Sequence, residues 1–187
     1  MLTRLADVAE VRTGFPFRGK VHDDPTGKLA VVQMKDVSDV GRLDPAACLH
    51  IQEESSHTRH LLRAGDVLLQ SRGSKFPAGV VDMPIHGIAA LGLHVLRPGP
   101  HVKPAYLAWI MNHTTTREAL RDMARGSYIP FLSKGDLEEL RVPVPDLATQ
   151  QRIVEILWLR AEERRLHEQR EALIDQLTWG AACATRD

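Results

Sequence analysis

The residues best equipped for chemistry lie in the segment SRGSKF at residues 71–76, which follows a run of apolar residues. Glycine lets a backbone approach a ligand closely, and serine hydroxyls bond either base edges or phosphates. The guanidinium of Arg72 can donate two hydrogen bonds to one guanine, while Ser74 and Lys75 can contact bases or nearby phosphates. The segment therefore predicts a loop that reads DNA bases, with an ordinary solvated hairpin loop as the alternative.

Four further polar side chains lie at a strand end or beside a second predicted loop. Lys35 lies at the end of a predicted strand and precedes Asp36, which allows a surface ion pair. The others lie in or beside the loop sequence GSYIP, and they are Arg125, Ser127 and Tyr128.

Residue patterns that support catalysis are absent. The Asp-Pro-Pro-Tyr or Asn-Pro-Pro-Tyr tetrapeptide of amino-methyltransferases does not occur, and no Gly-rich loop suits a nucleotide or a methyl donor. A magnesium nuclease needs clustered carboxylates and a lysine, and the nearest imitation is Asp24 with Lys35. His57 and His60 lack a third metal ligand. We expect no enzyme, no cofactor and no metal site, with a small Mg²⁺-dependent nuclease as the weaker alternative.

The composition is that of a globular protein with one domain and an appendage. The chain has 187 residues, 43% of them hydrophobic and 26% charged, and no apolar run approaches the length needed to span a bilayer. Cys48 and Cys183 fit no metal spacing, so both are expected to be reduced thiols. These features predict a cytoplasmic protein without a membrane segment.

The charge balance argues against a protein that holds DNA tightly by itself. Residues 1–146 carry 18 Lys and Arg against 17 Asp and Glu, and residues 147–187 carry 6 against 7. Because phosphate contacts dominate affinity for DNA, an independent DNA binder is expected to be strongly basic. The charge balance is compatible with a DNA-recognition protein whose partner supplies part of the affinity for the DNA backbone. It is equally compatible with a module that binds only protein.

The pattern along the chain predicts an α+β fold, with a bent, mostly antiparallel sheet and flanking helices. Helices are expected at Ala105–Asn112 and from about Thr115 to Arg125, and strands at Leu29–Met34, Gly65–Gln70, Gly79–Val81, Gly87–Ala90 and Leu93–Arg97.

The C-terminal third predicts a short helical turn, an extended segment and one long helix. Ser133 is a plausible N-cap for a turn at residues 134–138, and Arg141–Pro145 alternates prolines with valines as an edge strand does. Asp146 is placed to cap a helix that begins near Leu147, and no Gly or Pro follows until Gly180. The sequence therefore predicts a domain at 1–146, a long helix at 147–179 and a flexible tail at 180–187.

The long helix carries a heptad seam, defined here as Ile156, Leu159, Glu163, Leu166, Arg170, Leu173 and Leu177. Leucine recurs at every seventh residue, and charged residues occupy some seam positions, so the helix is expected to pack as a coiled coil against a partner. If two copies ran antiparallel and crossed near Leu166, Glu163 of one would meet Arg170 of the other.

The stretch GSYIPFLSKGDLEELRVPVPDLATQQRIVEIL, residues 126–157, resembles the specificity (S) subunits of type I restriction–modification systems. Their target recognition domain ends in GS-x-x-P-x-L-S-K-x-D-L-x-x-L-x-V-P-x-P, and their spacer helix opens L-A-x-Q-x-x-I-V-x-x-L. The resemblance extends upstream to residues 5–8 (LADV) and 64–69 (AGDVLL). Two mild departures are Asp146, where the family usually has a second proline, and Thr149, where it usually has Glu.

The resemblance implies a half-size S subunit, with one target recognition domain and one spacer helix and no activity of its own. In that family the S subunit recognises the DNA sequence at which modification (M) subunits methylate adenine, and it determines the target of the restriction (R) subunits that cut DNA. Its partners here would be double-stranded DNA, an M subunit and an R subunit. In that family a similar strand ends in a Lys-Asp or Arg-Asp pair close to the DNA-reading face, so the resemblance adds second candidates for DNA contacts: Lys35, Arg125, Ser127 and Tyr128. A homodimer through the helix at 147–177 would read two identical half-sites related by two-fold symmetry.

Overall fold

A computed structural model describes residues 2–38, 43 and 45–184. The chain divides into two compact units, residues 1–150 and residues 151–187. The first unit contains every strand of the described chain, together with three helices. The second unit is helical.

A four-stranded antiparallel sheet forms the middle of the first unit, in the order β2-β8-β5-β6. Its strands are β2 at Ala9–Thr13, β8 at Leu93–Pro98, β5 at Val67–Gln70 and β6 at Ala78–Val80. Val67 and Leu69 of the central strand β5 are fully buried, and β8 and β6 satisfy the backbone hydrogen bonds of its two edges. Strands β5, β6 and β8 match the predicted segments.

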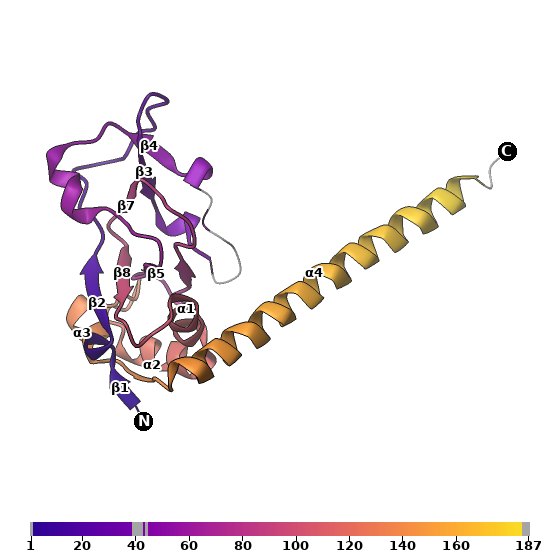
Figure 1. Ribbon diagram of the computed structural model, residues 1–187. Helices are drawn as coiled ribbons and strands as arrows, with labels where there is room; N and C mark the ends of the chain where they lie inside the picture. Colours follow the sequence, from indigo (N-terminus) through magenta and orange to yellow (C-terminus); the bar gives the residue numbers. More distant parts are fainter. Residues whose placement is uncertain (1, 39–42, 44, 185–187) are drawn as a thin grey trace. The chain divides into compact units, whose positions relative to one another are not determined.

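A second sheet lies at one end of the first unit, with the helices α2 and α3 and strand β1 at the opposite end (Figure 1). In this sheet β3, at Leu29–Val32, pairs antiparallel with β4 at Leu49–Ile51 and parallel with β7 at Gly87–Ala89. The prediction of an α+β fold rich in antiparallel pairs is confirmed. The strands divide between sheets, however, because β7 pairs with β3 and not with β8, and Gly92, with a φ of 110°, lies in the turn between β7 and β8.

The helices of the first unit follow the predicted segments closely. They are α1 at Pro104–Asn112, α2 at Thr114–Met123 and α3 at Lys134–Glu139. The predicted edge strand is β9 at Arg141–Pro143, and it pairs with β1 at Leu2–Arg4 in a separate two-stranded sheet. Four short 3₁₀ helices complete the described elements: η1 at Leu5–Asp7, η2 at Met34–Asp36, η3 at Pro45–Ala47 and η4 at Ser55–His60.

The long helix α4 runs from Leu147 to Ala184 and has 38 residues, or about 57 Å of length. Asp146 caps its start, as predicted, because the carboxylate accepts a 2.7 Å hydrogen bond from the backbone N–H of Thr149. Gln150 is completely buried, and its side-chain amide donates to the carbonyls of His101 and Pro145. The first turn of α4 is therefore anchored within the first unit.

The end of α4 lies beyond the predicted limit at residue 179. Residues 180–184, expected as tail, are helical, whereas residues 185–187 lie outside the described part of the chain. Gly180 costs only about 1 kcal/mol relative to alanine in a helix, and the alanines after it favour helix. None of the helices among the described residues combines the length and apolar content needed to cross a membrane.

Candidate nucleic-acid interface

Residues 71–76 form the tip of the β5–β6 hairpin. Leu69 pairs with Ala78, and the N–H of Gln70 donates to the carbonyl of Pro77 at 3.0 Å, which closes the loop. Phe76 has a φ of 46° and is fully buried, so the last residue of the loop is an anchor in the core. The side chains of residues 72–75 therefore project from a loop whose two ends are fixed by the hairpin and by Phe76.

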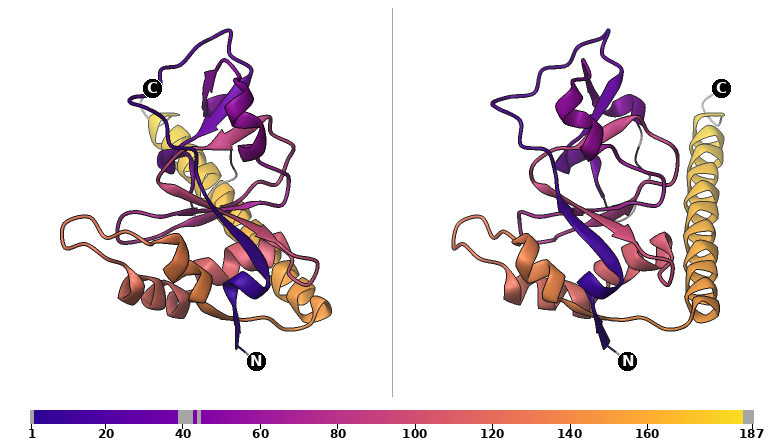
Figure 2. Two further views of the ribbon diagram at one scale, coloured as in Figure 1. Left: turned by 90° about the vertical axis from the view of Figure 1, so that its left-hand side faces the viewer. Right: turned by 60° about the vertical axis from the view of Figure 1, so that its left-hand side comes forward.

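A second loop, residues 125–131, connects α2 to α3 and extends away from the rest of the unit (Figure 2). Arg125 and Phe131 exchange backbone hydrogen bonds of 2.9 and 2.8 Å across its base. Gly126 has a φ of 96°, in the left-handed region that glycine adopts without strain, which allows the chain to reverse directly after Arg125. The loop is thus a short hairpin.

The two loops are joined by backbone hydrogen bonds, although more than fifty residues separate them in the sequence. The N–H of Gly73 donates to the carbonyl of Pro130 at 2.9 Å, and the N–H of Leu132, directly after the second loop, donates to the carbonyl of Ser71 at 2.8 Å. The guanidinium of Arg121 on α2 also donates to the carbonyl of Ser74. We call residues 71–76 and 125–131 the paired loops.

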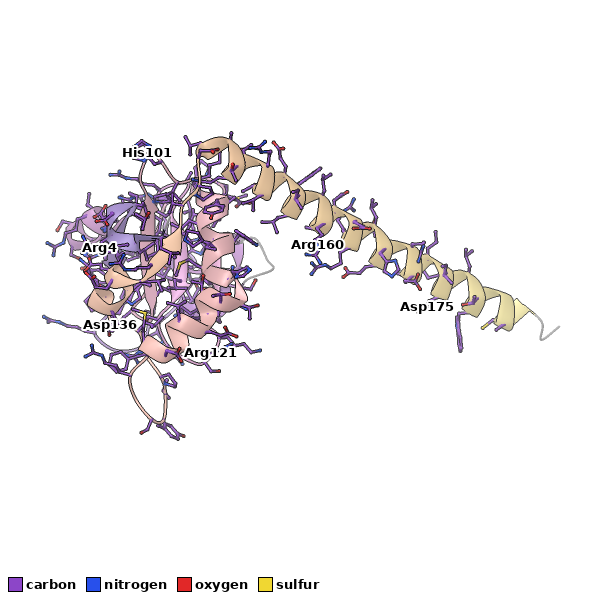
Figure 3. All side chains as sticks on the ribbon, turned by 90° about the horizontal axis from the view of Figure 1, so that it is seen from below. Arg4, His101, Arg121, Asp136, Arg160 and Asp175 are labelled. Carbon is purple, nitrogen blue, oxygen red and sulfur yellow. The ribbon has the colours of Figure 1, made fainter. Side chains whose placement is uncertain are left out.

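Helix α3 holds the base of the second loop. The hydroxyl of Ser133 accepts the N–H of Asp136, as the predicted N-cap requires, and donates to its carboxylate. The same carboxylate accepts a 2.7 Å hydrogen bond from Arg125. The Ser133 hydroxyl and then the Arg125 guanidinium lower the pKa of Asp136, so the carboxylate remains charged and Arg125 is held in place. Figure 3 labels Asp136 and Arg121, which lie near this loop.

Six of the predicted DNA-contacting residues lie on the paired loops, and all six are exposed: Arg72, Ser74, Lys75, Arg125, Ser127 and Tyr128. Within the described part of the chain, Arg72 and Lys75 form no ion pair, so their charges are available to a ligand. Arg125 and Lys134 pair with Asp136 and Glu138 of α3, so Arg72 and Lys75 supply the positive charge of the paired loops. The surface is therefore locally basic on a chain whose net charge is zero.

Lys35 lies on the neighbouring helix η2. The side-chain amide of Gln70 donates to the carbonyls of Met34 and Val37 at 2.7 and 3.0 Å, which ties η2 to the end of β5 just before the loop. The Lys35 ammonium is exposed and lies 4.0 Å from the carboxylate of Asp36, a weak surface pair. Gln70 therefore places η2, and with it Lys35, beside the start of the first loop.

Asp24, the other half of the nuclease alternative, lies elsewhere. It precedes β3, whereas Lys35 follows that strand, so the strand separates the two residues. The carboxylate of Asp24 accepts hydrogen bonds from Thr26 and Gln52, of which the Thr26 hydroxyl does most to lower its pKa. The Asp24 carboxylate therefore stabilises a local turn through these hydrogen bonds.

Five residues of the interface were not among those predicted from the sequence. Gln70, His94 and Arg121 support the paired loops from other elements, and Ile129 and Phe131 are partly exposed on the second loop. The exposure of two apolar residues in the segment YIPF, where a turn usually has polar residues, is a feature that the sequence could have signalled.

His94 on β8 links the sheet to the second loop. Its Nε2 lies 2.9 Å from the carbonyl of Leu132, so the neutral tautomer that donates this hydrogen bond fits the site. Burial lowers the pKa of His94, and the hydrogen bond to Leu132 opposes this only in part. The imidazole is therefore a neutral support of the loop.

We expect protonation of His94 to weaken the fold at acidic pH. Because its folded pKa lies below the ordinary value of 6.5, the unfolded chain takes up the proton first. The stabilisation is complete above pH 6.5 and is lost as the pH falls from there through the lowered pKa. Urea unfolding at several pH values measures the effect. The free energy of unfolding should fall less on acidification for His94→Gln, which keeps an amide donor, than for the wild type. An equal fall in the free energy of unfolding for both proteins would contradict this role of His94.

The seam residues of α4 are exposed within the second unit. Ile156, Leu159, Leu166, Leu173 and Leu177 have between 52% and 65% of their surface accessible. Such a row of large apolar side chains is typical of a helix that packs against another chain or segment. Trp158, Ile174 and Trp179 are also exposed on α4, and they were not assigned to the seam.

The first unit thus combines a mixed α and β fold with two joined loops, and the second unit is a long helix. Residues 1–176 match the family described as the type I restriction modification DNA specificity domain. The chain therefore belongs to this family, whose members recognise DNA and are not catalytic. No curated protein matches the chain.

Solved structures share this fold. The HsdS subunit from Thermoanaerobacter tengcongensis is 22% identical, with a TM-score of 0.65, and the alignment covers 91% of this chain and 39% of that one. A chain from a study of complex assembly and conformational transition of the type I R-M system is 24% identical, with a TM-score of 0.61 and coverages of 95% and 43%. The S subunit from M. genitalium is 14% identical, with a TM-score of 0.58 and coverages of 87% and 39%. The chain spans about two fifths of the length of these structures.

Proposed function

We propose that this chain reads one half-site of a DNA sequence through the paired loops and directs an M subunit and an R subunit to that site. The observation that carries the proposal is the backbone junction between the two loops. It brings Arg72 and Lys75 together with Ser127 and Tyr128 on one exposed, locally basic surface. Base readout requires several side chains in a fixed mutual geometry, and a junction of this kind supplies it.

Partner chains account for the near-neutral charge. A protein that neutralises few phosphates holds DNA weakly by itself, so an M subunit would supply part of the affinity while this chain supplies discrimination. We further propose that α4 pairs with α4 of a second copy through its seam, so that the dimer reads two half-sites related by two-fold symmetry. Cytoplasmic location belongs to the same proposal, and neither cysteine forms a disulfide.

The direct test is selection of bound sequences from a randomised DNA pool, with the full chain alone and with an M subunit. Replacing Arg72 with alanine is expected to lower discrimination at one base position by about 1–3 kcal/mol, the usual worth of a bidentate base contact. Lys75→Ala is the matched control. If Lys75 contacts phosphate, its loss weakens binding to all sequences alike and lowers the salt dependence by about one phosphate contact.

Unchanged selection by Arg72→Ala at the same salt concentration would remove Arg72 from the readout. Weak binding without any sequence preference, together with tight association through α4, would instead favour a protein-interaction module, the alternative that the neutral charge supports. Metal-dependent cleavage of DNA by the isolated chain would favour the nuclease alternative.

A further inference from the structure

The tip of the second loop exposes apolar and aromatic side chains to solvent. Tyr128 is 94% exposed, Ile129 is 56% exposed and Phe131 is 43% exposed. Hairpin tips usually carry Gly, Asn, Asp or Ser, because these residues suit turns and solvent. A cluster of exposed apolar residues on a short loop marks a contact surface.

The backbone holds this tip rigidly at its base. Arg125 and Phe131 exchange hydrogen bonds across the hairpin, and Pro130 accepts from Gly73 of the first loop. Asp136 fixes the Arg125 side chain from the side of α3. The loop therefore projects Tyr128 and Ile129 from a fixed base, as an insertion into another molecule requires.

The positive charges beside the tip of the second loop indicate which kind of ligand the tip binds. Arg72, Lys75 and Arg121 all lie on or against the paired loops and are exposed, whereas Arg125 pairs with Asp136 of α3. A polyanion with apolar, stackable surfaces between its charged backbones matches this combination, and duplex DNA is such a ligand. An apolar protein surface would satisfy the tip but leave these cations without partners.

We propose that Tyr128, with Ile129 beside it, inserts between two neighbouring base pairs as a wedge that unstacks and kinks the DNA. This inference rests on the proposed function and adds a source of specificity that requires no base-edge hydrogen bond. Pyrimidine–purine steps kink most readily, so the wedge selects a TA or CA/TG step at one position of the half-site. Arg72 reads a base at a separate position.

The test uses the full chain and duplexes recovered by selection, with 2-aminopurine in place of each adenine in turn, since TA and CA/TG steps both contain adenine. The wild type is expected to raise the fluorescence at one step and to enrich a pyrimidine–purine step there. Tyr128→Ala should lose both effects and bind about 5- to 150-fold more weakly, the range of aromatic–base stacking. Tyr128→Phe should retain them, because the ring and not the hydroxyl stacks. Arg72→Ala should retain the fluorescence change and lose preference only at its own position.

Each other outcome overturns the wedge. Sequence-selective binding by the wild type without any fluorescence change contradicts the wedge and leaves the proposed function intact. Loss of M-subunit binding in Tyr128→Ala, with DNA binding unchanged, assigns the tip to a protein surface. A wild type that binds no DNA, alone or with an M subunit, overturns the proposed function and the wedge together.

Discussion

Replacing Asp66 with alanine is expected to lower the free energy of unfolding by about 3–5 kcal/mol, because the change leaves a mostly buried cation without its partner. Asp66 and Arg97 on β8 form two parallel hydrogen bonds of 2.8 Å, and their side chains are 1% and 18% exposed. Asp66 also accepts the N–H of Arg63 at 2.8 Å, which closes the turn before β5. Urea denaturation of the full chain measures the effect.

Two further variants separate the buried pair from charge alone. Arg4→Ala removes the exposed pairs of Arg4 with Asp7 and Glu139, and its expected cost is below about 1 kcal/mol. The double variant Asp66→Leu with Arg97→Met removes both charges, so it should be more stable than Asp66→Ala. A cost for Asp66→Ala as small as that of Arg4→Ala would show that Arg97 finds another partner or reaches solvent.

Changing Leu159, Leu166 and Leu173 to serine is expected to abolish self-association of the chain. The proposed dimer buries these seam residues, which are otherwise more than half exposed, and each fully buried leucine contributes about 1.5–3 kcal/mol. Three such losses amount to several orders of magnitude in the dissociation constant. The mass of the purified chain in solution, measured by light scattering, should fall from two copies to one.

A matched control places three serines on α4 away from the seam, at Arg164, Arg165 and Glu168. These residues are exposed, so helix propensity changes similarly while the seam stays intact, and two copies are expected. A single copy for the wild type would overturn the proposed homodimer and direct the search to a helix of another chain. The antiparallel register predicts in addition that Glu163→Arg weakens association and that Arg170→Glu in the same chain restores it.

Local physics explains how much of the fold could be predicted. Ser133 and Asp146 cap the helices that follow them through hydrogen bonds to residues three positions away, so the signal and its partner lie in one short window. The alternation of Pro and Val predicted an edge strand at β9, and the absence of Gly and Pro predicted α4. The leucine repeat likewise indicated the seam, although its partner stays a prediction.

Long-range contacts account for what could not be predicted. The division of the strands between sheets depends on the parallel pairing of β3 with β7, which are more than fifty residues apart. The same is true of the bonds from residues 71 and 73 to the second loop. Neither strand propensity nor periodicity carries information about a partner at that distance, because both describe a residue within its own neighbourhood.

The amino-acid sequence by itself determined the class of the fold, the positions of most helices and strands, the family resemblance and the candidate basic residues. Only the tertiary structure decided that Arg72 and Tyr128 belong to one surface, that Asp136 holds Arg125, and that Tyr128 projects into solvent beside Ile129. The reason is physical. Chemical type and local conformation are properties of single residues and their neighbours, whereas a binding surface is a geometry between segments, and backbone hydrogen bonds and burial across the whole unit set that geometry.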